Sequence, residues 1–211
     1  MKERYRTIAR EASDEVIIQK SRFIGHACPC ATEEDALAFL RRMREEYRDA
    51  THNCYAYVIG ANQGIMRYSD DGEPTGTAGL PMMEVLKKRE IVNCAVVVTR
   101  YFGGILLGAG GLVRAYTQGC AIALEAAGPV IMERTRGLYC EVPYPVWDSL
   151  RHALETETAR MDQIEYSDRI SFRLLMKEED AEAMLERLNN VTGRKLEVVL
   201  SEESYEPWEI K

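Results

Sequence analysis

The chain has 211 residues and a mass of 24.0 kDa, with 46% hydrophobic and 29% charged residues. This composition is typical of one or two globular domains, and it excludes a collagen, a disordered chain and a disulfide-stapled miniprotein. No apolar run approaches the roughly 20 residues that cross a bilayer, and charges interrupt residues 1–24, where a secretory signal would stand. We therefore expect a cytoplasmic protein without a membrane partner.

The formal net charge of −7 is unevenly distributed along the chain. Residues 1–136 hold 18 Lys and Arg against 17 Asp and Glu, a net charge of +1, whereas residues 137–211 hold 9 against 17, a net charge of −8. Because an acidic surface repels phosphates, we expect any polyanionic partner to meet the first part of the chain.

Six cysteines lie inside apolar or periodic segments instead of punctuating loops. We predict reduced thiols that pack as small hydrophobic side chains. His26, Cys28 and Cys30 share one face of a predicted strand, so a metal site is conceivable there. A single Cys-x-Cys pair is a weak zinc signal, however, and we predict neither a metal nor a cofactor.

The elements predicted in residues 1–136 alternate between strands and amphipathic helices. In chain order they are a hairpin of strands 15–20 and 22–28, a helix capped by Thr32, a strand at 54–60, a polar loop at 68–74, a helix capped by Thr77, a buried strand at 91–99 and a helix from Leu112 to Gly128. Carboxylates in the first turn support the helix that follows Thr32. Its apolar residues at helical spacing, Leu37 among them, predict the face that packs in the core.

The remaining residues predict strand, helix, strand, strand, helix and strand. These elements occupy residues 138–142, 146–155, 160–166, 170–176, 178–190 and 195–200. This βαββαβ order favours a ferredoxin-like sandwich. We therefore predict an α+β protein of two α/β sandwich domains, at 1–136 and 137–204, followed by a tail at 205–211.

A glycine-rich segment between the buried strand and the next helix carries the most specific signal. Five of its nine residues are glycines, namely Gly103, Gly104, Gly108, Gly110 and Gly111. Glycine permits close backbone approach, and the helix that follows offers unpaired N–H groups to an anion. Arg100 and Arg114 flank the segment, and Arg67 is a further basic candidate, so we predict a site for an anion or nucleic acid. Tight packing of helix against strand explains the glycines equally well.

The polar loop holds a carboxylate cluster of Asp70, Asp71 and Glu73. Such a cluster suits Mg²⁺ or general acid/base chemistry, but Asp-Gly and Glu-Pro are also ordinary turn sequences. We favour a turn that braces the following helix. His52, in the segment before it, is a candidate base or a hydrogen-bond partner of an RNA base.

Three of these segments together resemble the IMPACT/YigZ family, also known as uncharacterised protein family 29. They are His52-Asn53-Cys54-Tyr55-Ala56, the stretch from Ser69 to Gly79, and the run from Arg100 to Tyr116 that holds the glycines. Their order also matches, and the resemblance is strong over residues 17–127. The later residues agree with the family by domain arrangement.

The resemblance implies a fold for each domain and an association with translation. The amino-terminal domain would share the βαβ fold of the second domain of a small-subunit ribosomal protein. The carboxy-terminal domain would be similar to the fifth domain of elongation factor G. Eukaryotic relatives act in translational control through a preceding domain that is not found in this sequence. For two-domain bacterial-type members the family implies no established reaction.

Three functional hypotheses follow. The first is a non-enzymatic module that binds RNA or a ribosome-associated protein at the glycine-rich segment and has a role in regulating translation. The second is a small-molecule enzyme that holds a phosphorylated ligand or nucleotide there, with Asp70 or Asp71 as the Mg²⁺ or acid/base group. The third is an adaptor that binds other proteins through its acidic second domain. We favour the first.

Overall fold

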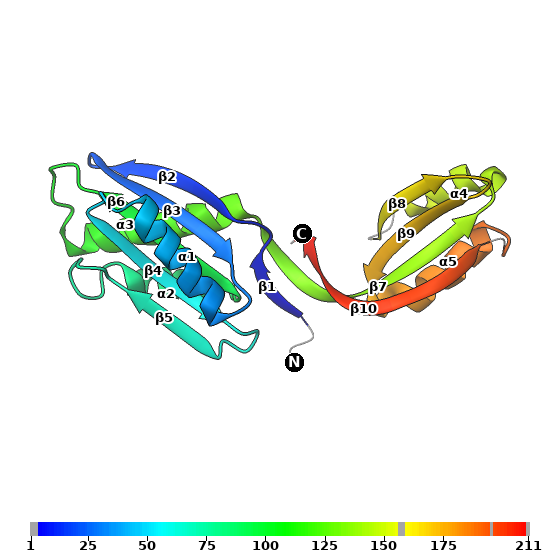
Figure 1. The fold of residues 1–211 in the computed structure, drawn as a ribbon, viewed down its shortest axis with the longest axis horizontal. Helices are drawn as coiled ribbons and strands as arrows, with labels where there is room; N and C mark the ends of the chain where they lie inside the picture. The colour runs from blue at the N-terminus through cyan, green and yellow to red at the C-terminus, as the bar shows by residue number, and fades with distance from the viewer. Residues whose placement is uncertain (1–3, 156–158, 195, 210–211) are drawn as a thin grey trace. The chain divides into compact units, whose positions relative to one another are not determined.

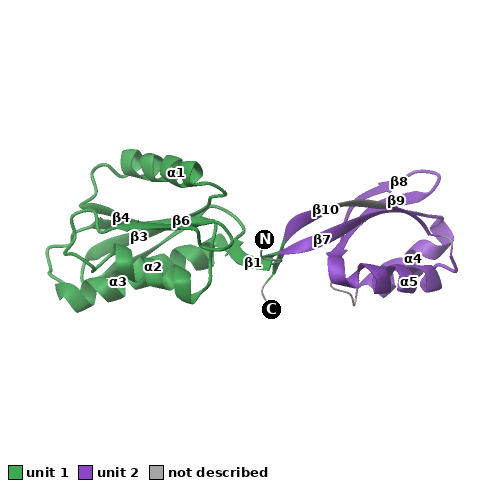
Figure 2. Ribbon diagram, turned by 90° about the horizontal axis from the view of Figure 1, so that it is seen from below, with its two compact units in different colours: residues 1–132, 207–211 green, residues 133–206 purple. Residues whose placement is uncertain are grey.

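The computed structural model describes residues 4–155, 159–194 and 196–209. The chain forms two compact units, one of residues 1–132 with 207–211 and one of residues 133–206 (Figure 2). Both units combine helices with an antiparallel sheet, which confirms an α+β protein with two α/β domains. The structure places the first boundary after Met132, whereas the sequence pattern places it after Arg136.

An antiparallel sheet of five strands forms the centre of the first unit, in the order β2-β3-β6-β4-β5 (Figure 1). Its strands are β2 (Ala12–Ile18), β3 (Ser21–Pro29), β4 (His52–Ile59), β5 (Ile65–Ser69) and β6 (Cys94–Tyr101). Helix α1 (Glu33–Glu46) covers one face, and α2 (Gly79–Lys88) and α3 (Gly108–Ala127) cover the other (Figure 2). The predicted elements of this domain are therefore present, and β5, which shares only residues 68–69 with the predicted loop, is an addition.

Strand β6 is buried on both faces, which explains its continuous apolar sequence. Val96 and Val98 belong to the core beneath α2 and α3, whereas Ala95 and Val97 belong to the core beneath α1. All four side chains are at most 1% exposed. The next residues along the strand, Thr99 and Arg100, are buried as well, and they carry the chain toward the glycine-rich segment.

Helix α1 begins with the predicted cap. The Thr32 side chain accepts a hydrogen bond from the Asp35 amide, and the Asp35 carboxylate accepts one from the Thr32 amide, which completes a capping box. The expectation that Leu37 faces the core is wrong, because this side chain is 42% exposed. Ala36, Phe39, Leu40 and Met43 face the sheet instead.

His26 in β3 is buried beside α1, and burial lowers its pKa to about 4. The unfolded chain, with an ordinary histidine pKa near 6.5, binds more protons than the folded one between these values. We therefore expect the free energy of unfolding to fall by about 3 kcal/mol through this group as the pH drops from about 7 to about 4. Urea unfolding of His26→Gln across this range should give a flatter profile than the unmodified chain.

The control for His26→Gln is His152→Gln, because the His152 side chain is 86% exposed. His152→Gln should leave the pH profile unchanged. An unchanged profile in His26→Gln as well would contradict the assignment of this pH dependence to His26.

The second unit contains the predicted βαββαβ order, with longer outer strands. Its elements are β7 (Pro129–Val142, which begins in the first unit), α4 (Tyr144–Leu154), β8 (Arg160–Tyr166), β9 (Ile170–Lys177), the short 3-10 helix η1 (Glu178–Asp180), α5 (Ala181–Val191) and β10 (Glu197–Glu209). Helices α4 and α5 lie on one face of the strands (Figure 2). Leu138, Leu150, Phe172 and Leu188 are among the residues of its core.

The two ends of the chain differ from the sequence-based expectation. Residues 205–209 form part of β10, which pairs with β7, instead of a tail. At the other end, β1 (Arg4–Ile8) was not predicted, and it lies beside β7 in the sheet order β1-β7-β9-β8. Lys195, where the last predicted strand begins, lies outside the described residues, as do Ile210 and Lys211.

All six cysteines are free thiols, and five of them are buried, as predicted. Burial raises the pKa of Cys120 to about 12 and that of Cys94 well above its ordinary value, so both remain protonated. Among the described residues, no group of three or more His, Cys, Asp or Glu side chains is arranged to hold a metal ion. In that same part of the chain, no helix is long and apolar enough to cross a membrane.

Candidate anion-binding groove

A groove of about 430 Å³ lies in the first unit where β4, β6 and the start of α3 meet. Among its lining residues are His52, Glu73, Arg100 and Gly108, four of the residues singled out from the sequence. The others are Thr51, Gly72, Pro74, Phe102, Leu106, Leu107, Ala109 and Leu112. We refer to this site as the groove.

A buried ion pair forms the floor of the groove. The Nη1 atom of Arg100 donates a hydrogen bond of 2.7 Å to Oε1 of Glu73, and the two side chains are 6% and 3% exposed. Tyr116 from α3 donates a second hydrogen bond of 2.7 Å to the same oxygen. Burial raises the pKa of Tyr116 most strongly, and the nearby Cys54 and Glu73 raise it further. The Tyr116 hydroxyl therefore stays protonated and can donate.

The guanidinium of Arg100 is only partly hydrogen-bonded. Its Nε atom is buried and has no hydrogen-bond partner, while Nη2 lies 3.4 Å from the Ser21 hydroxyl. The guanidinium carbon lies 5.4 Å from the ring centre of Phe23 and 5.5 Å from that of Phe102, within the range of cation–π attraction. These contacts hold the Arg100 guanidinium in place, and its buried Nε–H group has no hydrogen-bond partner among the described residues.

The structure fixes the orientation of His52. Its Nδ1 atom lies 2.8 Å from the backbone carbonyl of Asp71, and because a carbonyl only accepts, Nδ1 carries the proton of the neutral ring. Nε2 then has a free lone pair and lies 3.8 Å from Oε2 of Glu73. A histidine held in this way can accept a proton or a hydrogen bond at Nε2.

Asp70 braces the start of α2. Its carboxylate accepts hydrogen bonds of 2.8–3.1 Å from the backbone amides of Gly76, Ala78 and Gly79. No side chain of the helix's own N-cap residue, Ala78, performs this role, and Thr77, the predicted cap, bonds back to Pro74 instead. The carboxylate cluster thus forms the helix-bracing turn that the sequence favoured.

Asp71 is also engaged by its neighbours. One carboxylate oxygen accepts a hydrogen bond of 2.6 Å from the Asn53 amide, and the other lies 3.7 Å from the guanidinium of Arg44. Neither Asp70 nor Asp71 lines the groove. His52 and Glu73 are therefore better placed for acid/base chemistry in it than the two aspartates.

Helix α3 presents its N-terminus to the groove. It begins at Gly108, four residues before the predicted start, so Gly108, Gly110 and Gly111 belong to the helix and not to a loop. No side chain caps it, and its first turn contains no acidic residue. Unpaired amides and the positive end of the helix dipole therefore face the groove, where an anion is stabilised.

Arg114 lies over the first turn of α3. It is exposed, and it forms no ion pair with any described residue. A Cβ atom at Gly110 would lie only 3.8 Å from its Nη1, so the guanidinium folds back toward the start of the helix. Arg114 therefore adds a positive charge beside the unpaired amides.

The glycines before the helix have separate roles. A Cβ at Gly103 would lie 2.0 Å from the backbone carbon of Lys20, so Gly103 allows the segment to pack against the β2–β3 turn. Its amide donates to the Ser21 hydroxyl at 3.1 Å. Gly104 has φ +82° and open space around it, so its role is to let the chain change direction. Close packing therefore accounts for Gly103, whereas Gly108 and Gly110 lie in the first turn of α3.

Not all predicted residues converge on the groove. Arg67 is exposed on β5 and donates to the neighbouring Met66 carbonyl, away from the lining residues. Leu106, Pro74 and Ser21 contribute to the site and were missed. The 86% exposure of Leu106 is visible only in the fold, and Ser21 is 79 positions from Arg100 in the sequence, so no local pattern signals either.

The fold and the groove define an α+β protein of two domains, with the candidate site in the first. Residues 19–124 match the family described as the Impact N-terminal domain, and residues 140–194 match a domain of unknown function, DUF1949. The chain belongs to the IMPACT family.

Relatives extend over both domains. The IMPACT family member YvyE of Bacillus subtilis is 39% identical over 201 residues, which cover 95% of this chain and 93% of that protein. The IMPACT family member YigZ of Escherichia coli is 48% identical over 110 residues, 51% of this chain and 54% of YigZ. A crystal structure described as that of a hypothetical protein aligns with 96% of this chain and 99% of its own, at 29% identity and a TM-score of 0.60.

Proposed function

We propose that this protein is a non-enzymatic module that binds the phosphate backbone of RNA in the groove of its first domain. The observation that carries the proposal is the uncapped N-terminus of α3, which opens into the groove beside the exposed Arg114. Helix amides and an arginine together are a recurring arrangement for phosphate recognition.

Exposed apolar side chains beside these groups suit the bases of a single strand. Phe102 is 46% exposed and Leu106 is 86% exposed, and both line the groove. Aromatic and apolar surfaces support unstacked bases without demanding a sequence. A groove with phosphate donors on one side and apolar residues on the other favours single-stranded over double-stranded RNA.

A role in translation is part of the proposal. It is supported by the resemblance of both domains to translation proteins. The βαββαβ order of the second unit agrees with the ferredoxin-like topology that this resemblance implies. The charge distribution supports the first domain as the RNA-binding one, because the second carries the excess of carboxylates. A ribosome-associated protein that presents RNA would meet the same groove.

Reversing the charge of Arg114 tests the site. Arg114→Glu should abolish the salt-sensitive part of RNA binding, because it places a carboxylate beside the amides that receive the phosphate. The measurement is fluorescence anisotropy of a short labelled single-stranded RNA, at low and at physiological salt. Arg41→Glu is the matched control, since it reverses an equally exposed arginine on α1. Unchanged RNA affinity in Arg114→Glu would refute the site.

A second candidate function is catalysis on a small phosphorylated molecule. The orientation of His52 favours it, since Nδ1 is held by the Asp71 carbonyl and Nε2 lies 3.8 Å from Oε2 of Glu73, which also lines the groove. A nucleotide with Mg²⁺ would then raise the melting temperature and displace the labelled RNA from the groove. RNA binding that resists excess ATP and Mg²⁺, with no melting shift across a nucleotide panel, would favour the binding module.

A further inference from the structure

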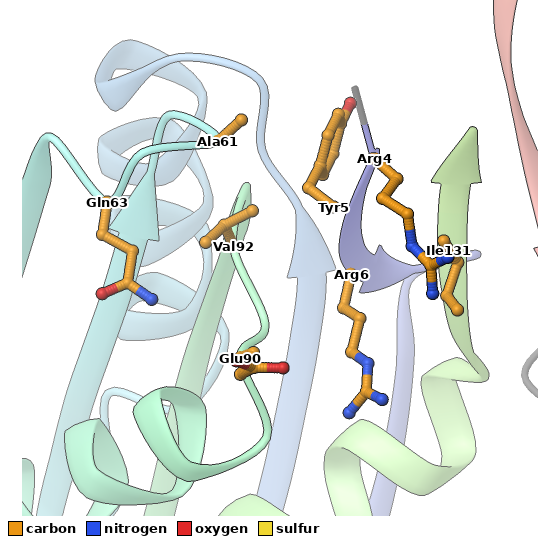
Figure 3. Close-up of a pocket in the computed structure, with 8 residues that line it drawn as sticks. All are labelled: Arg4, Tyr5, Arg6, Ala61, Gln63, Glu90, Val92 and Ile131. Atoms are coloured by element: carbon orange, nitrogen blue, oxygen red, sulfur yellow. The ribbon is translucent and has the colours of Figure 1, made fainter. Parts of the chain in front are cut away.

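A second pocket lies in the first unit, formed by residues that do not line the groove. It has a volume of about 480 Å³, within the range of small-molecule sites. Figure 3 shows its eight lining residues, which come from β1, the β4–β5 turn, the connection between α2 and β6, and the start of β7. They are Arg4, Tyr5, Arg6, Ala61, Gln63, Glu90, Val92 and Ile131.

The walls of this pocket are anchored by main-chain contacts. The Val92 amide donates to the Arg6 carbonyl at 2.9 Å, which fixes β1 against the strand that enters the core. The Asn93 side chain accepts a hydrogen bond of 2.8 Å from the Gly60 amide, which ties the β4–β5 turn to the same connection. Ile8 at the end of β1 is 2% exposed in the main core. The pocket is therefore a built part of the fold.

The charged side chains that line the pocket are mostly positive, which favours an anionic ligand. Arg4 and Arg6 are exposed and extend from the same strand (Figure 3), and within the described ranges neither forms an ion pair. Glu90 is the one carboxylate among the lining residues. Two guanidinium groups two residues apart on a strand leave it on the same side, which suits a single phosphate or a pair of neighbouring ones.

The remaining lining residues suit an organic group attached to the phosphate. Tyr5, Val92 and Ile131 offer apolar surface, while the Gln63 amide and the Glu90 carboxylate offer a hydrogen-bond donor and acceptors. We propose that this pocket binds a small organic phosphate of nucleotide size, with Arg4 and Arg6 on the phosphate and Glu90 accepting from hydroxyl or amino groups. The site is separate from the groove and does not depend on the function proposed for it.

The test uses the full chain and isothermal titration calorimetry with adenosine monophosphate, adenosine and inorganic phosphate as probes. The monophosphate should bind with a Kd below about 1 mM, and adenosine and inorganic phosphate should each bind more weakly. Arg4→Gln combined with Arg6→Gln should weaken the monophosphate at least about tenfold. Arg114→Glu, at the start of α3, should leave this affinity unchanged.

Two further variants distinguish binding in this pocket from a general effect of net charge and from an effect of misfolding. Arg41→Gln with Arg48→Gln removes the same charge from exposed residues on and after α1, and should keep the affinity. Glu90→Gln should tighten monophosphate binding severalfold, because it removes the negative charge beside the phosphate, and a poorly folded variant would not gain affinity. Equal losses in the two double variants, or no effect of Arg4 and Arg6, would overturn the proposal.

Discussion

Glu73→Ala is expected to lower the free energy of unfolding by about 3–5 kcal/mol. The Glu73 carboxylate accepts hydrogen bonds from Arg100 and from Tyr116, and all three side chains are buried. Its removal leaves the Arg100 charge unpaired in the interior and the Tyr116 hydroxyl without its acceptor, and both are costly. Urea unfolding followed by circular dichroism measures the loss.

Two variants show whether the loss arises from the unpaired charge. Glu84→Ala removes an exposed carboxylate of α2 and should change the free energy of unfolding by less than about 0.5 kcal/mol. Glu73→Gln combined with Arg100→Met removes both charges, and it should recover a substantial part of the stability lost in Glu73→Ala. A Glu73→Ala variant as stable as Glu84→Ala would contradict the buried pair.

Gly25→Ala is the second substitution with a large expected effect. A Cβ at position 25 of β3 would lie 2.1 Å from the carbonyl oxygen of Gly119 in α3, and 2.9 Å from the Cβ of Ala123. The obstructing atoms belong to the main chain and to a short side chain, so a rotamer change cannot relieve them. We expect α3 to be pushed from the sheet, at a cost of about 3 kcal/mol or more in urea unfolding.

Because α3 also supplies the floor and rim of the groove, Gly25→Ala should weaken RNA binding along with stability. Gly104→Ala is the matched control in the glycine-rich segment. Position 104 has φ +82° but nothing within 4 Å, so the added methyl costs only about 1 kcal/mol of backbone strain. Equal destabilisation by the two substitutions would contradict close packing of α3 on β3.

Local patterns in the sequence sufficed for much of the fold. Thr32 with Asp35 signals the start of α1, and the apolar run around Val96 signals a strand covered on both faces. Asp70 in a turn before a helix was correctly interpreted as a brace. In each case the residues that cause the structure lie within a few positions of one another.

The site required the tertiary structure, because its contacts join distant residues. Arg100 and Arg114 look alike in sequence, but Arg100 is buried against Glu73, 27 positions away, and Arg114 remains exposed over Gly110. Strand β1 and the extension of β10 escaped prediction since their short polar sequences lack a clear period, and pairing with β7 holds them in place.

If phosphate binds at the start of α3, as we propose, amide chemical-shift mapping by NMR will locate it there. A short single-stranded RNA is added to the full chain at low salt, and the shifts are followed residue by residue. We expect the largest changes at Gly104 and at the amides of residues 108–112, and we expect Arg114→Glu to abolish them. Shifts confined to other surfaces, or identical shifts in Arg114→Glu, would contradict it.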